Sequence, residues 1–89
     1  MQFEWDKNKN KSNTEKHGIM FEEATAAFRD KNSVYLFDGD VHGEIRQHVI
    51  GKINRLILAL VVYADRNDNI RIISARRANK KEKEQYYAK

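Results

Sequence analysis

Hydrophobic and polar residues follow two different periods along the chain, and the change falls near residue 33. Before it, apolar residues recur at helical spacing, as at Phe21, Ala24 and Phe28. After it, apolar and polar residues alternate with the period of two that is typical of β-strands. The pattern predicts an α+β protein in which an antiparallel sheet carries its helices on one face.

The N-terminal third is predicted to contain a short strand and two helices. Phe3–Trp5 alternates like a strand, and Asp6 after it is a good N-cap for a helix that runs to about Lys16. Gly18 follows as a typical C-terminal cap. A second, short amphipathic helix covers Phe21–Phe28, and its aromatic face is expected to be core.

Four further strands are predicted after residue 33. Short links rich in Gly, Asp and Asn separate them, so we expect hairpins and an antiparallel meander that joins the N-terminal strand in one sheet. The strands are Val34–Phe37, Glu44–Gly51, Arg55–Ala64 and Ile70–Ala75. The third should be central, because Leu56–Val62 is apolar on both faces.

A short C-terminal helix is predicted over Lys80–Lys89. Asn79 and Glu82 have the spacing of a capping box, with Asn in place of Ser or Thr. Tyr86 and Tyr87 are its main apolar residues, so we expect this helix to bury little and to be held weakly.

Length and composition indicate a single cytoplasmic domain over residues 1–89. A chain of 89 residues cannot assemble a second core, and the absence of cysteine excludes disulfides and thiolate zinc sites. The longest apolar run, Leu56–Ala64, is far shorter than the roughly 20 residues of a membrane helix. We therefore expect a soluble protein that does not bind membranes.

The positive charge is concentrated at the C-terminal end. Residues 71–89 carry seven basic and two acidic side chains, a balance of +5, whereas the other 70 residues have a balance of −1. A local basic patch attracts polyanions through counterion release. A solvated basic helix would have the same composition, so charge alone leaves both interpretations open.

One polar row is predicted on the second long strand. Glu44, Arg46 and His48 are spaced by two, which points the three side chains to the same side of the sheet. Such a row is costly to bury and could face a groove filled with solvent. It could equally be the ordinary wet face of an antiparallel sheet.

Adjacent arginines follow the last strand. Arg76 and Arg77 are expected where this strand ends and the terminal helix begins, with helix amides nearby, and this arrangement suits a phosphate group. An alternative is that they only form ion pairs with Glu44 or with an acid of the helices.

Other chemistries are disfavoured. The segment from Asp38 resembles the opening of a calcium loop, but its twelfth position is Val49 instead of Glu. The histidines lack the spacing of a zinc site, and there is no nucleophile elbow or glycine-rich nucleotide loop. We therefore expect neither a metal nor a cofactor.

The chain resembles the BrnT toxin family over nearly its full length. Three groups of residues carry the resemblance, one at each end and one in the middle. They are Phe3, Trp5, Asp6, Lys9, Asn13, Lys16-His17-Gly18 and Phe21-Glu22-Glu23-Ala24; Glu44, Arg46 and Ile50-Gly51; and Ile70 to Ala78 with Glu82 and Tyr86. His48 departs from the family pattern, in which an apolar or aromatic residue is expected.

The resemblance implies a toxin of a type II toxin–antitoxin system with a RelE-like fold. It implies a metal-independent ribonuclease that blocks translation and growth and is neutralised by a BrnA-type antitoxin. It also implies a heterotetramer of two toxins and two antitoxins, which binds operator DNA through the antitoxin.

Candidate site residues follow from what RNA cleavage requires. We expect Arg46, Arg76 and Arg77, from two neighbouring strands, to stabilise the charge that develops on the phosphate. Glu44 is the candidate base, with Lys52 or His48 as substitutes. The candidate RNA-binding residues are Lys52, Arg55, Arg71, Lys80, Lys81 and His48.

Two other functions are compatible with the same residues. A non-catalytic nucleic-acid-binding module would bind in a salt-dependent way without cleaving RNA. A purely structural interaction protein would do neither.

Overall fold

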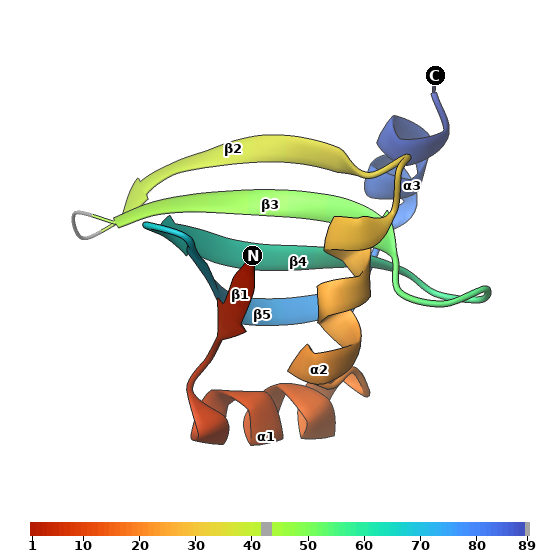
Figure 1. The fold of residues 1–89 in the computed structure, drawn as a ribbon. Coiled ribbons are helices and arrows are strands. Elements are labelled where there is room, and N and C mark those ends of the chain that lie inside the picture. The colour runs from red at the N-terminus through yellow and green to blue at the C-terminus, as the bar shows by residue number, and fades with distance from the viewer. Residues whose placement is uncertain (42–43, 89) are drawn as a thin grey trace.

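The structure, a computed structural model, describes residues 1–41 and 44–88, without the side chains of residues 38, 40, 41 and 44. The predicted order was a strand, two helices, four strands and a helix, and the structure follows it with the second helix divided into a short α-helix and a 3-10 helix (Figure 1). The elements are β1 (Gln2–Glu4), α1 (Lys7–His17), α2 (Phe21–Ala24), the 3-10 helix η1 (Thr25–Arg29), β2 (Val34–Val41), β3 (Glu44–Lys52), β4 (Leu58–Arg66), β5 (Asn69–Arg77) and α3 (Lys80–Tyr87).

The five strands form one mixed sheet in the order β1-β5-β4-β3-β2. Strands β2 to β5 pair in an antiparallel meander with β4 at the centre, as predicted. β1 pairs with β5 in parallel, so the prediction of a wholly antiparallel sheet was wrong. The physical reason is the long helical connection after β1, which does not impose the direction that a short hairpin loop imposes.

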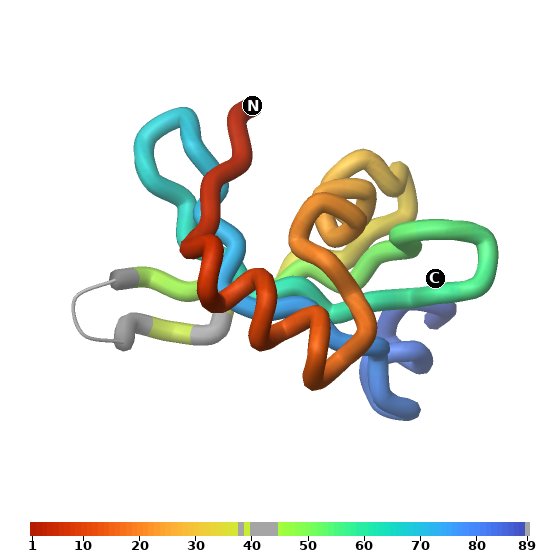
Figure 2. The backbone as a smooth tube through the Cα atoms, turned by 90° about the horizontal axis from the view of Figure 1, so that it is seen from below, coloured from red at the N-terminus to blue at the C-terminus, as the bar shows by residue number. Residues whose placement is uncertain are grey.

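The helices cover both faces of the sheet, whereas one face was predicted. Figure 2 shows η1 on one side of the strands and α3 on the other. On the first face Phe21 and Ala27 pack with Val61, and on the second face Leu60 packs with Tyr86. β4 is apolar on both faces, so each face must be covered. α3 comes directly after β5 and covers the second face.

Helix α1 is attached to the sheet by the side chain of Asn13. This side chain is buried, with 7% of its surface exposed. Its amide donates to the carbonyl oxygens of Ile19 (3.0 Å) and Ala75 (2.8 Å), and its oxygen accepts from the Ala75 amide (3.1 Å). Asn13 thus satisfies the edge of β5 beyond the end of β1, as a neighbouring strand would.

The predicted caps of α1 are both present. The Asp6 carboxylate accepts hydrogen bonds from the amides of Asn8 (2.8 Å) and Lys9 (3.0 Å). Gly18 ends the helix in the left-handed region at φ +73°, where its lack of a Cβ avoids strain.

Two predicted boundaries differ for reasons of local hydrogen bonding. The second helix is one α-helical turn, α2, that tightens into η1. The strand predicted from Arg55 begins at Leu58, because the Asn54 side chain accepts from the amides of Leu56 (2.8 Å) and Ile57 (2.9 Å). Residues 53–57 therefore form a loop, called the β3–β4 loop below, which extends beyond the sheet (Figure 1).

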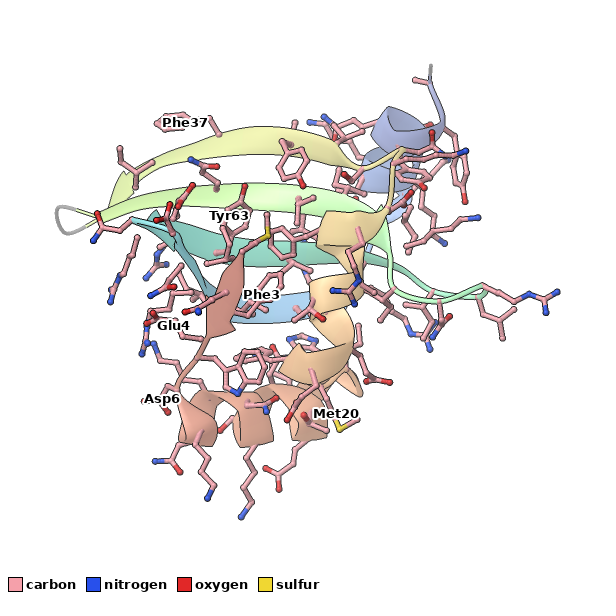
Figure 3. All side chains as sticks on the ribbon, in the orientation of Figure 1. Phe3, Glu4, Asp6, Met20, Phe37 and Tyr63 are labelled. Carbon is pink, nitrogen blue, oxygen red and sulfur yellow. The ribbon has the colours of Figure 1, made fainter. Side chains whose placement is uncertain are left out.

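Aromatic rings fill the space between the sheet and η1. Phe28 contacts Phe3 and Tyr63, with ring centroids 5.2 and 4.9 Å apart. Burial raises the pKa of Tyr63 to about 12, and its hydroxyl donates to Gln47. Phe37 on the edge strand β2 is instead 72% exposed and lies beyond these rings (Figure 3).

Candidate nucleic-acid interface

Arg76 and Arg77 lie inside β5, which runs on past the predicted end at Ala75. Arg76 is level with Leu60 and Arg77 with Ala59 on the neighbouring strand β4. Successive residues of a strand point to opposite faces, so the two guanidinium groups are separated. The structure thus divides a pair that the sequence suggested would act together.

Arg76 is bound to an acid of α3. Its Nη1 and Nη2 donate to the two carboxylate oxygens of Glu82 at 2.9 and 2.8 Å. The Glu82 side chain is 13% exposed, and these bonds raise the pKa of Arg76 above its ordinary value. The sequence left two interpretations of Arg76 open, phosphate binding and an ion pair with an acid of the helices. The structure contains the ion pair.

The predicted capping box is present at the start of α3 and engages two of the amides there. The Asn79 amide donates to Glu82 Oε1, and the Glu82 amide donates to Asn79 Oδ1, both at 2.9 Å. Glu82 therefore serves the helix cap and the Arg76 ion pair at once, and this anchors α3 on the sheet.

Arg77 lines a cationic cleft at the end of the sheet. The cleft has a volume of about 320 Å³ and lies between the β3–β4 loop, the end of β5 and α3. Among the residues that the structure describes, four cations and no acid line it. Its lining residues are Lys52, Arg55, Leu56, Leu58, Arg77, Ala78, Lys83 and Tyr87.

A second hollow beside the cleft is also rich in cations. Arg29 lines it together with Lys52 and Arg55, and Asp30 is its acidic member. The Asp30 carboxylate accepts from the Lys52 amide (2.8 Å) and the Tyr86 hydroxyl (2.5 Å). Burial raises the pKa of Asp30, but these hydrogen bonds outweigh it and leave the pKa below its ordinary value. The Asp30 charge is thus engaged in holding α3.

Arg46 and His48 lie on the α3 face of the sheet but away from the cleft. β4 separates β3 from β5, so the expectation that Arg46 and Arg76 come from neighbouring strands was wrong. Ile50 of β3 is level with Arg76 of β5, because both pair with Leu60 of β4. Arg46 precedes Ile50 by four residues, so its backbone is displaced from that of Arg76 by about 13 Å along the strands and about 10 Å across them. Arg46 Nε is buried and has no hydrogen-bond partner among the described residues.

The remaining predicted residues are distributed over the surface. Arg71 forms an ion pair with Glu4 at 2.9 Å, on the β1 side of the sheet. Lys80 and Lys81 are exposed in the first turn of α3. The Glu44 side chain lies outside the described residues, and its backbone is at the opposite end of β3 from Lys52.

Three residues of the cleft were missed by sequence reasoning. Leu56 was assigned to a central strand but lies in the β3–β4 loop and is 91% exposed. Lys83 belongs to the basic C-terminal run, and Tyr87 was interpreted as packing surface. The sequence pattern could not separate Tyr87, which is 62% exposed, from Tyr86, which is 5% exposed. The distinction depends on which side of α3 meets the sheet.

The part of the chain that the structure describes contains neither a metal-binding cluster of side chains nor a helix that could span a membrane. Within residues 1–41 and 44–88, no cluster of three or more His, Cys, Asp or Glu side chains has a geometry that could hold a metal ion. No helix in that part of the chain is long and apolar enough to cross a membrane.

The fold and the cleft define a small α+β protein whose cationic surface fits a polyanion. A family profile described as the ribonuclease toxin BrnT of a type II toxin–antitoxin system matches residues 5–82. The chain is also similar to the Brucella abortus ribonuclease toxin BrnT, whose crystal structure it matches with a TM-score of 0.69 and 26% identity over 90% of this chain and 99% of that one. The search among curated proteins found no match.

The chain therefore belongs to the BrnT family of ribonuclease toxins of type II toxin–antitoxin systems. Membership in such a system implies an antitoxin partner.

Proposed function

We propose that this chain is a metal-independent endoribonuclease that binds the RNA backbone in the cationic cleft. The observation that carries the proposal is the convergence of Lys52, Arg55, Arg77 and Lys83 on one cleft without a lining acid. These four cations come from β3, the β3–β4 loop, β5 and α3. Phosphate groups are bound strongly by such clusters, and guanidinium groups can bind them through two hydrogen bonds each.

The chemistry requires cations at the phosphate, a proton acceptor for the 2′-hydroxyl and a proton donor for the 5′-oxygen. The ribose 2′-oxygen forms a bond to the adjacent phosphorus and gives up its proton, while the bond to the 5′-oxygen breaks and that oxygen takes a proton. Charge gathers on the phosphorane, where one well-placed donor lowers the barrier by about 3 to 4 kcal/mol. Arg55 and Arg77 are proposed as these donors, and Lys52 as the source of the proton for the 5′-oxygen.

The proton acceptor for the 2′-hydroxyl stays a prediction. Glu44 was the candidate base, with Lys52 or His48 as substitutes, and all three lie on β3. Because Lys52 is proposed here as the proton donor, Glu44 and His48 remain, and they precede Lys52 by eight and four residues. At about 3.3 Å per residue these backbone positions are about 26 and 13 Å from Lys52. A role for Arg46 at the same phosphate stays a prediction as well, as does the contribution of Arg71, Lys80 and Lys81 to a longer RNA path.

The partner is proposed to be a BrnA-type antitoxin. In this proposal two toxins and two antitoxins assemble in the cytoplasm, and the antitoxin binds operator DNA. The support is the family resemblance alone, and the RelE-like classification of the fold rests on the same resemblance.

The test is cleavage of a purified single-stranded RNA by the purified chain in the presence of a chelator. We expect products with a 2′,3′-cyclic phosphate, and a loss of about 100-fold or more in rate for Arg77→Ala. Lys52→Ala is expected to be similarly impaired, whereas Lys11→Ala, an exposed lysine of α1, removes the same charge without effect. Binding without cleavage would identify the non-catalytic module instead, and equal rates for all variants would refute the proposed site.

A further inference from the structure

An exposed aromatic ring forms one wall of the cationic cleft. The ring belongs to Tyr87 in the last turn of α3, and 62% of this residue is exposed. The Lys52 ammonium group lies over the ring, 6.0 Å from its centroid, and much of Tyr87 remains open to solvent next to the cations proposed to bind phosphate.

The ring is held in place by its neighbours on α3. Tyr86 contacts Tyr87 edge-on, with centroids 4.9 Å apart and planes at 87°. Tyr86 itself is buried and donates to Asp30, and one turn earlier Glu82 binds Arg76. Because both anchors tie α3 to the sheet, a ligand of the cleft meets a ring that is already positioned.

A second apolar group lines the same cleft from the β3–β4 loop. Leu56 is 91% exposed, and the Asn54 side chain fixes the backbone at this position through the Leu56 amide. The cleft thus combines cations with two exposed apolar groups from different segments of the chain. A ligand that carries both an anion and a flat apolar surface would satisfy both kinds of group.

We propose that the cleft takes single-stranded RNA by stacking one nucleobase on Tyr87, next to the phosphate held by Lys52 and Arg77, with Leu56 contacting the same nucleotide. The inference rests on the proposed function and specifies its substrate. A base can offer its face to Tyr87 only when it is free of its neighbours in a duplex. Stacking requires no particular base, so the preference is for unpaired strands over paired ones.

The experiment measures binding with a strand that cannot be cleaved. A fluorescent single-stranded oligodeoxythymidylate octamer lacks the 2′-hydroxyl, and an abasic octamer of the same backbone lacks the bases as well. Anisotropy titrations compare both strands on the wild-type chain and on the variants Tyr87→Ala, Tyr87→Phe and Leu56→Ala. Circular dichroism checks that α3 remains folded in each variant.

We expect the wild-type chain to bind the base-containing strand about tenfold more tightly than the abasic strand. Tyr87→Phe should keep this ratio, Leu56→Ala should reduce it, and Tyr87→Ala should bring it close to one. Lys52→Ala should weaken the binding of both strands and leave the ratio unchanged. A matching duplex should bind the wild-type chain more weakly than the single strand.

Equal binding of the two strands by the wild-type chain, binding of neither, or an unchanged ratio in Tyr87→Ala would overturn the inference. Cleavage of ordinary RNA is measured in parallel. A chain that distinguishes the two strands but leaves RNA intact would refute the ribonuclease mechanism and keep the stacking site. A chain that cleaves RNA but binds the two octamers equally would refute the stacking site and keep the ribonuclease mechanism.

Discussion

Arg76 of β5 and Glu82 of α3 are joined by two parallel hydrogen bonds of 2.9 and 2.8 Å across the second face of the sheet. The pair is one of two polar anchors of α3, and α3 supplies Lys83 and Tyr87 to the cationic cleft. Arg76, one of the candidate arginines, thus helps to hold one wall of the cleft, while its neighbour Arg77 lines it.

Glu82→Gln should loosen α3, because it removes the carboxylate that binds Arg76 and the Asn79 amide. We expect the free energy of unfolding in urea to fall by about 1 to 2 kcal/mol. Glu84→Gln makes the same change at an exposed position of the same helix and should cost less than about 0.5 kcal/mol. Equal losses in the two variants would show that the ion pair does not anchor the helix.

Acid should destabilise the fold through the two carboxylates that hold α3. Burial raises the pKa of both Asp30 and Glu82, but hydrogen bonds outweigh it and leave both pKa values below their ordinary values. A lowered folded-state pKa gives stability that is complete above the ordinary value and is lost as pH falls through the folded value. The free energy of unfolding should therefore decrease below about pH 4.

Asp30→Asn tests the first of these groups. Its unfolding free energy should depend less on pH in the acid range than that of the wild-type chain, as measured by urea titrations between about pH 6 and 3. A variant with the same acid dependence as the wild-type chain would argue against a role for Asp30 in acid unfolding.

The salt dependence of RNA binding should reflect the number of phosphate groups that the cations of the cleft neutralise. Each phosphate neutralised on a single strand contributes about 0.7 to the slope of log affinity against log salt. Lys83→Ala should therefore reduce the slope by about 0.7, with the uncleavable octamer as ligand. Lys11→Ala, an exposed lysine of α1 that does not line the cleft, serves as the matched control. If Lys11→Ala lowered the slope as much as Lys83→Ala does, the binding surface would not be the cleft.

Asn13→Ala should be among the most damaging changes in the polar part of the chain. It leaves the amide and the carbonyl group of Ala75 without their partner at the edge of β5. We expect a loss of about 3 kcal/mol in the free energy of unfolding. Asn8→Ala, at an exposed position of the same helix, should be nearly neutral. A mild effect at Asn13 would mean that water or β1 can satisfy this edge.

The local elements of this protein could be predicted from the sequence. Asp6 and Gly18 mark the ends of α1, and Asn79 with Glu82 marks the start of α3, because a cap involves groups only a few residues apart. The alternation after residue 33 predicted the meander of β2 to β5 for a similar reason, since short links bring consecutive strands together. The basic C-terminal end was visible as composition.

The tertiary structure decided which side chains meet. The parallel pairing of β1 with β5 and the position of α3 on the second face depend on contacts between residues far apart in the chain. So does the pairing with β4 that extends β5 over Arg76 and Arg77 and thereby points them to opposite faces. A periodic pattern states that a face is apolar but does not state which element will cover it. For this reason composition could predict a cationic surface, but only the packing of α3 beside the β3–β4 loop could show that Lys83 and Tyr87 belong to it.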